Sequence, residues 1–287
     1  MKEKAFRIGR RTSELVLQYK SLAVMSVYAV VYLIAFYYLE QRDVAVHEIG
    51  MEIDGYIPFC EIFIVPYLLW FAYVALTVVF LCIRDKEESD RLVAFLMAGM
   101  TIFIVVSAVF PNGHNLRPKV FARDNLFIDL IRHLYATDTP TNILPSIHVY
   151  NSVAIMIAVW RSRCFAGHNI FKALMLALGV SIICSTVLIK QHSMLDVLLA
   201  LMLSAVMYSV CYRRSCIYGK AQIKNSSAGS CFFLLDTCIF RSMDHDMGNA
   251  VVIFLWHDED LASARQGEGN SLTAAVDLVA QFVEIVL

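Results

Sequence analysis

The sequence predicts an all-α polytopic membrane protein, built as a bundle of six transmembrane helices. Two observations support this fold class. Of the 287 residues, 59% are apolar and only 17% are charged, whereas soluble domains average roughly 45–50% apolar and about 25% charged residues. A soluble chain of this length cannot cover its surface with so few polar side chains. In addition, long apolar stretches recur along residues 21–212.

Six apolar stretches are candidates for crossing the ~30 Å hydrocarbon core of a bilayer, which takes about 20 helical residues. In chain order they are residues 21–39, 62–83, 92–110, 145–160, 173–189 and 193–212. The first follows a basic segment, as a signal peptide would. It is too long for one, however, and ends in bulky residues 36–39 without a small-residue cleavage site. The fourth and sixth stretches contain His148 and Asp196, which are unusual residues for a span.

Basic residues in the loops predict the orientation, because positively charged loops stay on the cytoplasmic side. If the N-terminus is cytoplasmic, the inner segments hold 16 Lys and Arg residues and the outer segments hold 6. We therefore expect a multi-pass protein of the plasma membrane with both termini inside the cell. The loop 111–144 and the turn 190–192 then share the outer face.

Two segments lie outside the predicted membrane domain, residues 21–212. Residues 1–20 form a basic cytoplasmic N-terminus. Residues 213–287 contain no uncharged run long enough to cross a bilayer, so we interpret them as a cytoplasmic tail without an assigned role. The formal net charge of −1 gives no field that would attract a polyanion, and nucleic acid is not an expected partner.

The fourth span opens with the sequence Pro145-Ser146-Ile147-His148. Proline suits the first turn of a helix, since its missing N–H would be unpaired there. The free N–H groups of that turn attract anions. Ser146 adds a hydroxyl donor, and His148 adds a donor that can lose its proton. The alternative is an ordinary capped helix start with a histidine at the membrane interface.

His192 and Asp196 are four residues apart, so on a helix they lie on one face. A carboxylate that accepts a hydrogen bond from one imidazole nitrogen fixes the tautomer and leaves the other lone pair available, as in an activated histidine nucleophile or base. Lys190 lies in the same turn and can contact an anion as a point charge. The alternative is a structural His–Asp pair between helices.

Arg117 lies in the predicted outer loop, next to Pro118. By itself, an arginine there is usually a solvated loop cation or a lipid headgroup contact. Residues 126–135 have apolar side chains at helical spacing, which predicts a short interfacial helix. Such a helix can fold Arg117 back over the predicted site.

In combination, these motifs resemble the type 2 phosphatidic acid phosphatase superfamily, in a divergent branch near the inositol phosphorylceramide synthase-like lipid phosphotransferases. The family pattern is K-x6-R-P, then P-S-G-H, then S-R-x5-H-x3-D. The matching segments here are Arg117-Pro118, residues 145–148, and Ser185 through His192 to Asp196. The resemblance covers roughly residues 60–212 and includes the six-helix layout.

Three positions depart from the family pattern. Phe110 stands in place of the lysine, Ile147 in place of the glycine and Thr186 in place of the arginine. Two cations that bind phosphate in the family are therefore replaced. Lys190 is a candidate substitute for one of them, and Lys119 or Arg123 for the other.

The resemblance implies a lipid-phosphate phosphatase or phosphotransferase that needs neither a metal nor a cofactor. His192 would attack the phosphorus of a lipid phosphate or diphosphate and become phosphorylated, while Asp196 orients its ring. His148 would protonate the leaving oxygen. The phosphate oxygens would be held by Arg117, Ser146 and Lys190. Water or an alcohol acceptor would then take the phosphoryl group, and membrane lipids are the expected partners.

Two other functions compete with this one. His148, His192 and Asp196, joined by His114, would make a ligand set for a metal ion. Alternatively, the chain is a non-catalytic transporter or scaffold with a degenerate site, whose buried polar groups line a path or join helices. Against a transporter, the sequence contains no internal repeat, and its polar groups gather at one interface.

Overall fold

The computed structural model describes the backbone of residues 2–213 and the side chains of residues 19–212. Apart from Arg213, the predicted tail lies outside the described residues. The main helices are α1 (Lys2–Glu40), α2 (Ile64–Arg84), α3 (Lys86–Val109), α4 (Leu126–Thr137), α5 (Ile147–Arg161), α6 (Asn169–Leu188) and α7 (Met194–Tyr208). Short 3-10 helices are η1 (Glu52–Gly55), η2 (Glu61–Phe63) and η3 (Arg163–Phe165), and a π-helical turn, η4 (Ser209–Arg213), follows α7.

Five helical segments are long and apolar enough to cross a membrane, so the described chain has the composition of an all-α polytopic membrane protein. These segments are Tyr19–Glu40, Glu61–Arg84, Lys86–Val109, Asn169–Leu188 and Met194–Tyr212. The structure confirms the helical class and five of the six predicted spans by length and composition. The remaining one, α5, has only 15 residues, or about 22 Å at 1.5 Å per residue. It is short because Ser162, directly after Arg161, has the extended backbone angles φ −61° and ψ 134°.

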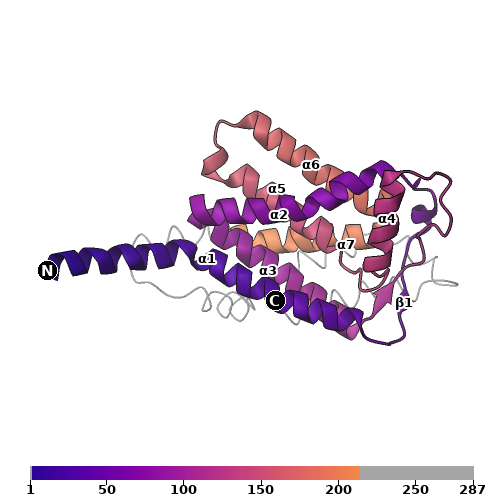
Figure 1. The fold of residues 1–287 in the computed structure, drawn as a ribbon, viewed down its shortest axis with the longest axis horizontal. Helices are drawn as coiled ribbons and strands as arrows, with labels where there is room; N and C mark the ends of the chain where they lie inside the picture. Colours follow the sequence, from indigo (N-terminus) through magenta and orange to yellow (C-terminus); the bar gives the residue numbers. More distant parts are fainter. Residues whose placement is uncertain (1, 214–287) are drawn as a thin grey trace, which may run out of the picture. The chain divides into compact units, whose positions relative to one another are not determined.

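Helix α5 lies at the centre of the bundle and packs against α2, α3, α6 and α7 (Figure 1). Most of its side chains are buried, and the partly exposed ones in its second half, Val153, Met156, Ile157 and Trp160, form a single stripe. Gly99 of α3 permits a close approach, because a Cβ atom there would lie 2.0 Å from the ring of Tyr150. The Tyr150 hydroxyl then donates to the Phe95 carbonyl at 2.8 Å. These contacts fix the separation between α3 and α5.

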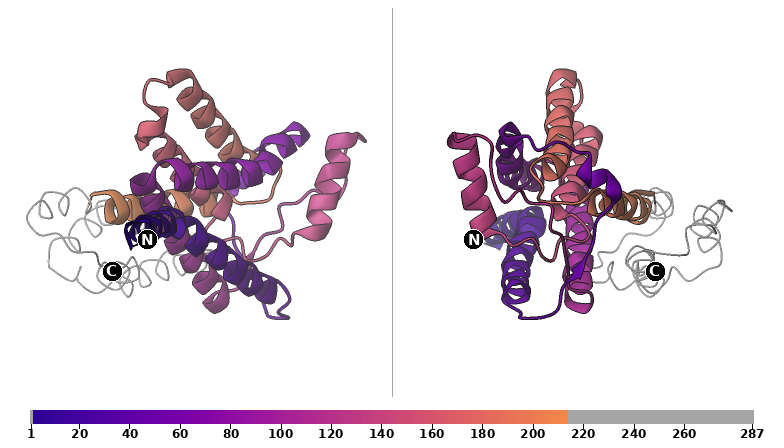
Figure 2. Two further views of the ribbon diagram at one scale, coloured as in Figure 1. Left: turned by 60° about the vertical axis from the view of Figure 1, so that its left-hand side comes forward. Right: turned by 90° about the vertical axis from the view of Figure 1, so that its right-hand side faces the viewer.

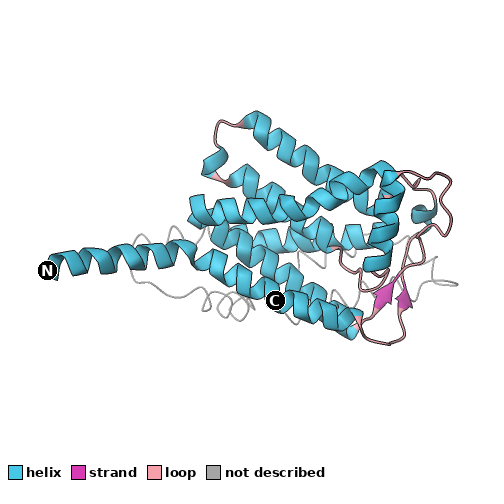
Figure 3. Ribbon diagram, in the orientation of Figure 1, coloured by secondary structure: helices cyan, strands magenta, loops and turns pink. Residues whose placement is uncertain are grey.

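Most of the non-helical segments lie at one end of the long helices, as Figure 3 shows in pink and magenta, and a further loop joins α5 to α6 at the other end. At the first of these ends, β1 (His47–Glu48) pairs in parallel with β2 (Asn112–Gly113). Asn112 also holds the segment before α5, since its Oδ1 accepts from the N–H groups of Ile143 and Leu144, both at 3.0 Å. This end of the bundle therefore has a defined backbone at the point where α5 begins.

Helix α4 runs across this end of the bundle, as Figure 1 and the two views of Figure 2 show. It confirms the short helix predicted over residues 126–135 and extends it to Thr137. Asn125 caps it by accepting from the Ile128 N–H at 3.0 Å. Ile131 packs into an apolar cluster with Ile64, Tyr67 and Ile189, so α4 is anchored on the ends of α2 and α6.

Candidate active site

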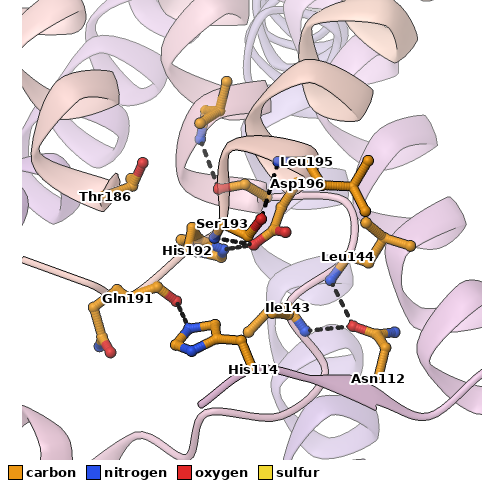
Figure 4. Close-up of polar contacts among 12 residues, drawn as sticks. Asn112, His114, Ile143, Leu144, Thr186, Gln191, His192, Ser193, Leu195 and Asp196 are labelled. Atoms are coloured by element: carbon orange, nitrogen blue, oxygen red, sulfur yellow. Dashed lines mark hydrogen bonds and ion pairs between the residues drawn. The ribbon is translucent and has the colours of Figure 1, made fainter. Parts of the chain in front are cut away.

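The turn between α6 and α7 places His192 at the end of the bundle. Two consecutive N–H groups, those of Gln191 and His192, donate to the Thr186 carbonyl at 2.9 and 3.0 Å. Lys190 adopts a left-handed conformation with φ +55°, which reverses the chain direction. Ser193 then caps α7, accepting from the Leu195 N–H at 3.1 Å (Figure 4). The position of His192 therefore depends largely on main-chain hydrogen bonds.

His192 and Asp196 form the predicted pair, with 2.9 Å between Nδ1 and Oδ2 (Figure 4). The same Oδ2 accepts from the Ser193 N–H at 3.0 Å, so the carboxylate is aligned from two sides. Asp196 is fully buried and His192 is 8% exposed. The physical basis differs from the prediction, because His192 precedes the helix and its ring folds back onto the first turn. A hydrogen on Nδ1 that points to the carboxylate leaves the Nε2 lone pair as the basic site.

Burial lowers the pKa of His192 below its usual value, and the charge of Arg117 lowers it further. The Ile143 carbonyl acts in the opposite direction. Because a histidine must be neutral to act as a nucleophile, this environment keeps the ring in the reactive form at neutral pH.

His148 lies beside His192, with 5.6 Å between the ring centroids. Its imidazole stacks on Tyr67, with 4.5 Å between ring centroids, and also contacts the tilted ring of Trp70 at 4.3 Å; both residues are on α2. Its Nε2 is buried and has no hydrogen-bond partner among the described residues. An unpaired buried nitrogen is costly, so this atom is a natural contact for a substrate group.

Ser146 caps α5 and is fully buried. Its Oγ accepts from the Val149 N–H at 3.4 Å, and an accepting hydroxyl can still donate its own hydrogen. The Ser146 N–H donates to the Asp196 carbonyl at 3.4 Å. The first turns of α5 and α7 therefore touch, and this contact brings together the two histidines, which are far apart in the sequence.

Arg117 also reaches this group of residues. One guanidinium nitrogen donates to the carbonyls of Asp138, at 2.8 Å, and Tyr135, at 3.3 Å. The other terminal nitrogen donates to Oε1 of Gln191, the neighbour of His192. The guanidinium also lies 4.5 Å from the centroid of the Tyr135 ring. Helix α4 thus folds Arg117 back to the site, as its amphipathic pattern predicted.

Gln191 is a site residue that the sequence analysis did not identify. Besides accepting from Arg117, its amide Nε2 donates to Asp138 Oδ2 at 2.9 Å. Burial raises the pKa of Asp138 to about 6, although Arg117 opposes this shift. The one signal in the sequence was a glutamine between Lys190 and His192 at the end of a span. Its partners are 53 and 74 positions away, so spacing does not reveal them.

Lys190 makes contacts that the sequence did not predict. Its Nζ donates to the carbonyls of Asp54, at 2.7 Å, and Ile57, at 2.6 Å. The Asp54 carboxylate in turn accepts from Ser193 Oγ and the Met194 N–H, both at 2.7 Å. Two of the three ammonium hydrogens thus join the η1 segment to the turn before α7. Phosphate binding by Lys190 stays a prediction and depends on the third hydrogen.

Two of the three positions that depart from the family pattern have structural contacts. Thr186 is buried, and its Oγ1 donates to the Ile183 carbonyl at 2.7 Å. Phe110 stacks on His47 with 4.7 Å between centroids. Of the proposed substitute cations, Arg123 pairs with Glu61 at 3.1 Å, and Lys119 is exposed. A second phosphate-binding cation is therefore not evident in the described part of the chain.

His114, a candidate metal ligand, has both ring nitrogens engaged. Nδ1 accepts from the Leu116 N–H at 3.1 Å, and Nε2 therefore donates to the Gln191 carbonyl at 2.9 Å. Burial also lowers the pKa of His114, which favours this neutral form. In this arrangement neither nitrogen has a lone pair for a metal, so His114 acts as a support for the turn that carries His192.

Comparison with models of protein families, with curated proteins and with solved structures found no significant match for this chain.

Proposed function

We propose that the chain is a membrane lipid-phosphate phosphatase or phosphotransferase that acts through a phosphohistidine intermediate. The observation that carries this proposal is the buried His192–Asp196 pair at 2.9 Å, with His148 beside it. A nucleophile, its orienting carboxylate and a second titratable ring are the groups that phosphoryl transfer through histidine requires. The proposal includes membership of the type 2 phosphatidic acid phosphatase superfamily, with α5 as its sixth bundle helix.

In the first step, the Nε2 lone pair of His192 attacks the phosphorus of a lipid phosphate. A P–N bond forms, the P–O bond to the lipid breaks, and His148 donates a proton to the leaving oxygen. The ring of His192 becomes positively charged, and the Asp196 carboxylate stabilises it through Nδ1–H. This use of Asp196 explains why a carboxylate is retained in a fully buried position.

In the second step, water or a lipid alcohol attacks the phosphohistidine. His148 accepts the proton of the attacking O–H, the P–N bond breaks, and its electron pair returns to Nε2. Arg117 offsets the charge on the non-bridging oxygens, together with the Ser146 hydroxyl and the first-turn N–H groups of α5. Phosphoryl transfer depends mainly on such positioning and charge neutralisation.

The orientation of the chain is part of the same proposal. With both termini in the cytoplasm, the site lies at the outer face of the plasma membrane. Its substrates are then lipids of the outer leaflet with a phosphate or diphosphate group. The headgroup would approach along the end of the bundle that contains α4 and β1.

The test uses the full chain purified in detergent, with a chelator present. Phosphate release and transfer to an added lipid alcohol would be measured for phosphatidate, an isoprenoid diphosphate and a phosphosphingolipid. We expect turnover of at least one substrate, and a phosphoenzyme stable to base and labile to acid. His192→Ala should abolish both signals. His133→Ala, at an exposed position of α4, is the matched control and should retain them.

A folded wild-type protein that turns over none of these substrates would contradict the proposal. It would favour the scaffold alternative, in which the His–Asp pair only joins helices. Turnover that disappears in the chelator would instead favour a metal-dependent reaction.

A further inference from the structure

A groove lies at the opposite end of the bundle from the two histidines. It is formed where α5 ends, α6 begins and α7 ends, and it has a volume of about 430 Å³. Its walls are mainly apolar, with Met156, Trp160, Leu176 and Tyr208 among the lining residues. A volume of several hundred Å³ with apolar walls and few polar groups is typical of ligand sites.

The apolar part of the groove faces the surroundings of the bundle. Trp160 is 64% exposed and Leu176 is 44% exposed, and Leu176 belongs to a helix that is apolar enough to span a membrane. Around such a helix the solvent is lipid, so a hydrocarbon chain is the occupant that these walls favour. Tryptophan at this depth is typical of the boundary between hydrocarbon and headgroups.

Two cations lie at the rim of the groove. The Lys172 ammonium donates to the Trp160 carbonyl at 3.0 Å and lies 5.5 Å from the centroid of its ring. Lys172 forms no ion pair within the described residues, so its charge and two of its N–H groups face the rim. Cations at helix ends keep their charged groups at the interface in this way.

Arg161 is the second rim cation. It donates to the Tyr208 hydroxyl at 3.5 Å and lies 4.9 Å from the centroid of the Tyr212 ring. The carboxylate that faces it is Glu88, whose Oε2 is 3.9 Å from Arg161 Nε and 3.6 Å from Arg91. Arg161 also lines a second, polar pocket, which it shares with Arg91, Arg163 and three carboxylates, those of Asp85, Glu87 and Glu88. These carboxylates balance the three arginines, so the excess positive charge at the rim is that of Lys172, and this charge attracts an anion.

We propose that this groove binds one anionic phospholipid. An acyl chain lies against Met156, Leu176 and Tyr208, and the phosphate contacts Lys172 and Arg161. In the proposed orientation this lipid belongs to the cytoplasmic leaflet, where anionic lipids are concentrated. The site is separate from the histidines, so binding of the lipid does not depend on the proposed reaction; only the choice of leaflet rests on the proposed orientation.

Trp160 provides the measurement. The full chain is reconstituted in nanodiscs that contain phosphatidylcholine and a small fraction of lipid with brominated acyl chains, either phosphatidylglycerol or phosphatidylcholine. Bromine quenches tryptophan fluorescence at contact distance. We expect at least two-fold stronger quenching by brominated phosphatidylglycerol at an equal mole fraction. Trp160→Phe should remove this difference, because any quenching at other tryptophans does not depend on this groove.

Lys172→Gln tests the headgroup contact and should reduce the preference for phosphatidylglycerol by at least half. Lys86→Gln is the matched control, since Lys86 is an exposed cation at the start of α3 outside the groove. Equal quenching of the wild type by both brominated lipids would overturn the proposal. So would equal loss of preference in both lysine variants, which would indicate general surface attraction instead of a site.

Discussion

Arg117 and Gln191 are joined by a hydrogen bond from the guanidinium to the side-chain amide oxygen. This bond connects the loop after α3 to the residue directly before His192. The same amide donates to Asp138, so one glutamine aligns a cation and a carboxylate around the turn. Gln191 is thus the link between the predicted phosphate-binding cation and the predicted nucleophile.

Gln191→Leu should lower kcat/KM by about 10-fold or more, because loss of a buried hydrogen-bond partner costs about 1–3 kcal/mol. We expect a rise in KM together with a fall in kcat, since Arg117 would contact phosphate in the ground state and in the transition state. Steady-state kinetics with a lipid phosphate measure both effects. Gln41→Leu, at an exposed position after α1, is the control. An unchanged KM in Gln191→Leu would contradict the alignment of Arg117.

The two histidines should differ in their dependence on the leaving group. His192→Ala should abolish turnover with every substrate, because no phosphoenzyme forms. His148→Ala should retain more activity on a substrate with a good leaving group, which needs little protonation. The measurement is kcat for a lipid phosphate and for an aryl phosphate with each variant. Equal losses on both substrates would argue against the assigned roles.

Lys190→Met should lower the apparent Tm of the detergent-solubilised protein by several degrees. The substitution leaves the Asp54 and Ile57 carbonyls without their donor, and hydrogen bonds to charged groups contribute about 1.5–3 kcal/mol each. If Lys190 also binds phosphate, kcat/KM should fall by about 10²-fold, as when one preorganised donor is removed. Adding Thr186→Arg should then restore part of that activity without restoring Tm. Unchanged Tm with lost activity would mean that phosphate binding is its main role.

Asp138 should make stability depend on pH. Its folded pKa is raised to about 6 from a usual value of 3.8, so the folded state binds the proton more tightly than the unfolded state. This contribution is therefore present at low pH and is lost as the pH rises from about 4 to about 6. Apparent Tm measured across this range should fall more steeply in the wild type than in Asp138→Asn. Parallel curves would show that Asp138 titrates normally.

The orientation can be tested with a thiol reagent that does not cross membranes. Val120→Cys and Ile170→Cys are suited to this, because both side chains are more than 80% exposed and lie at opposite ends of the bundle. In intact cells, labelling above that of the parent chain should occur at position 120 only. Position 170 should be labelled after permeabilisation. The reverse pattern would place the histidines on the cytoplasmic side.

The helices and the His–Asp contact were predictable because both depend on local spacing. Apolar runs predict long helices. Residues four apart lie close together on a helix, and His192 and Asp196 also do so here, although His192 lies just before α7. The end of α5 was predicted to within one residue, at 160 against Arg161. The contact that follows it was not predicted: Ser162 has an extended backbone, and its Oγ donates to Asp85 at 2.7 Å. That partner is 77 positions away. Apolar composition thus showed where the helix ends, but not which distant residue it contacts there.

The supporting residues of the site were not predictable for a related reason. Asp54 is 139 positions from Ser193, and its carboxylate becomes important only because the two segments meet in space. His114 was identified as a candidate metal ligand, but its contacts with two backbone groups make it a support for the turn. The sequence therefore pointed to the candidate reactive groups, while the groups that position them depend on tertiary contacts.

Main-chain hydrogen bonds bring the two candidate catalytic histidines together. The Ser146 N–H donates to the Asp196 carbonyl, and the N–H groups of Gln191 and His192 both donate to the Thr186 carbonyl. Such contacts do not depend on side-chain identity. The neighbouring side chains of Ile147 and Thr186 are buried, so substitutions there should leave His148 and His192 in place when they preserve the side-chain volume. Conservative changes at these two positions would therefore show how far the main-chain contacts alone hold the two histidines.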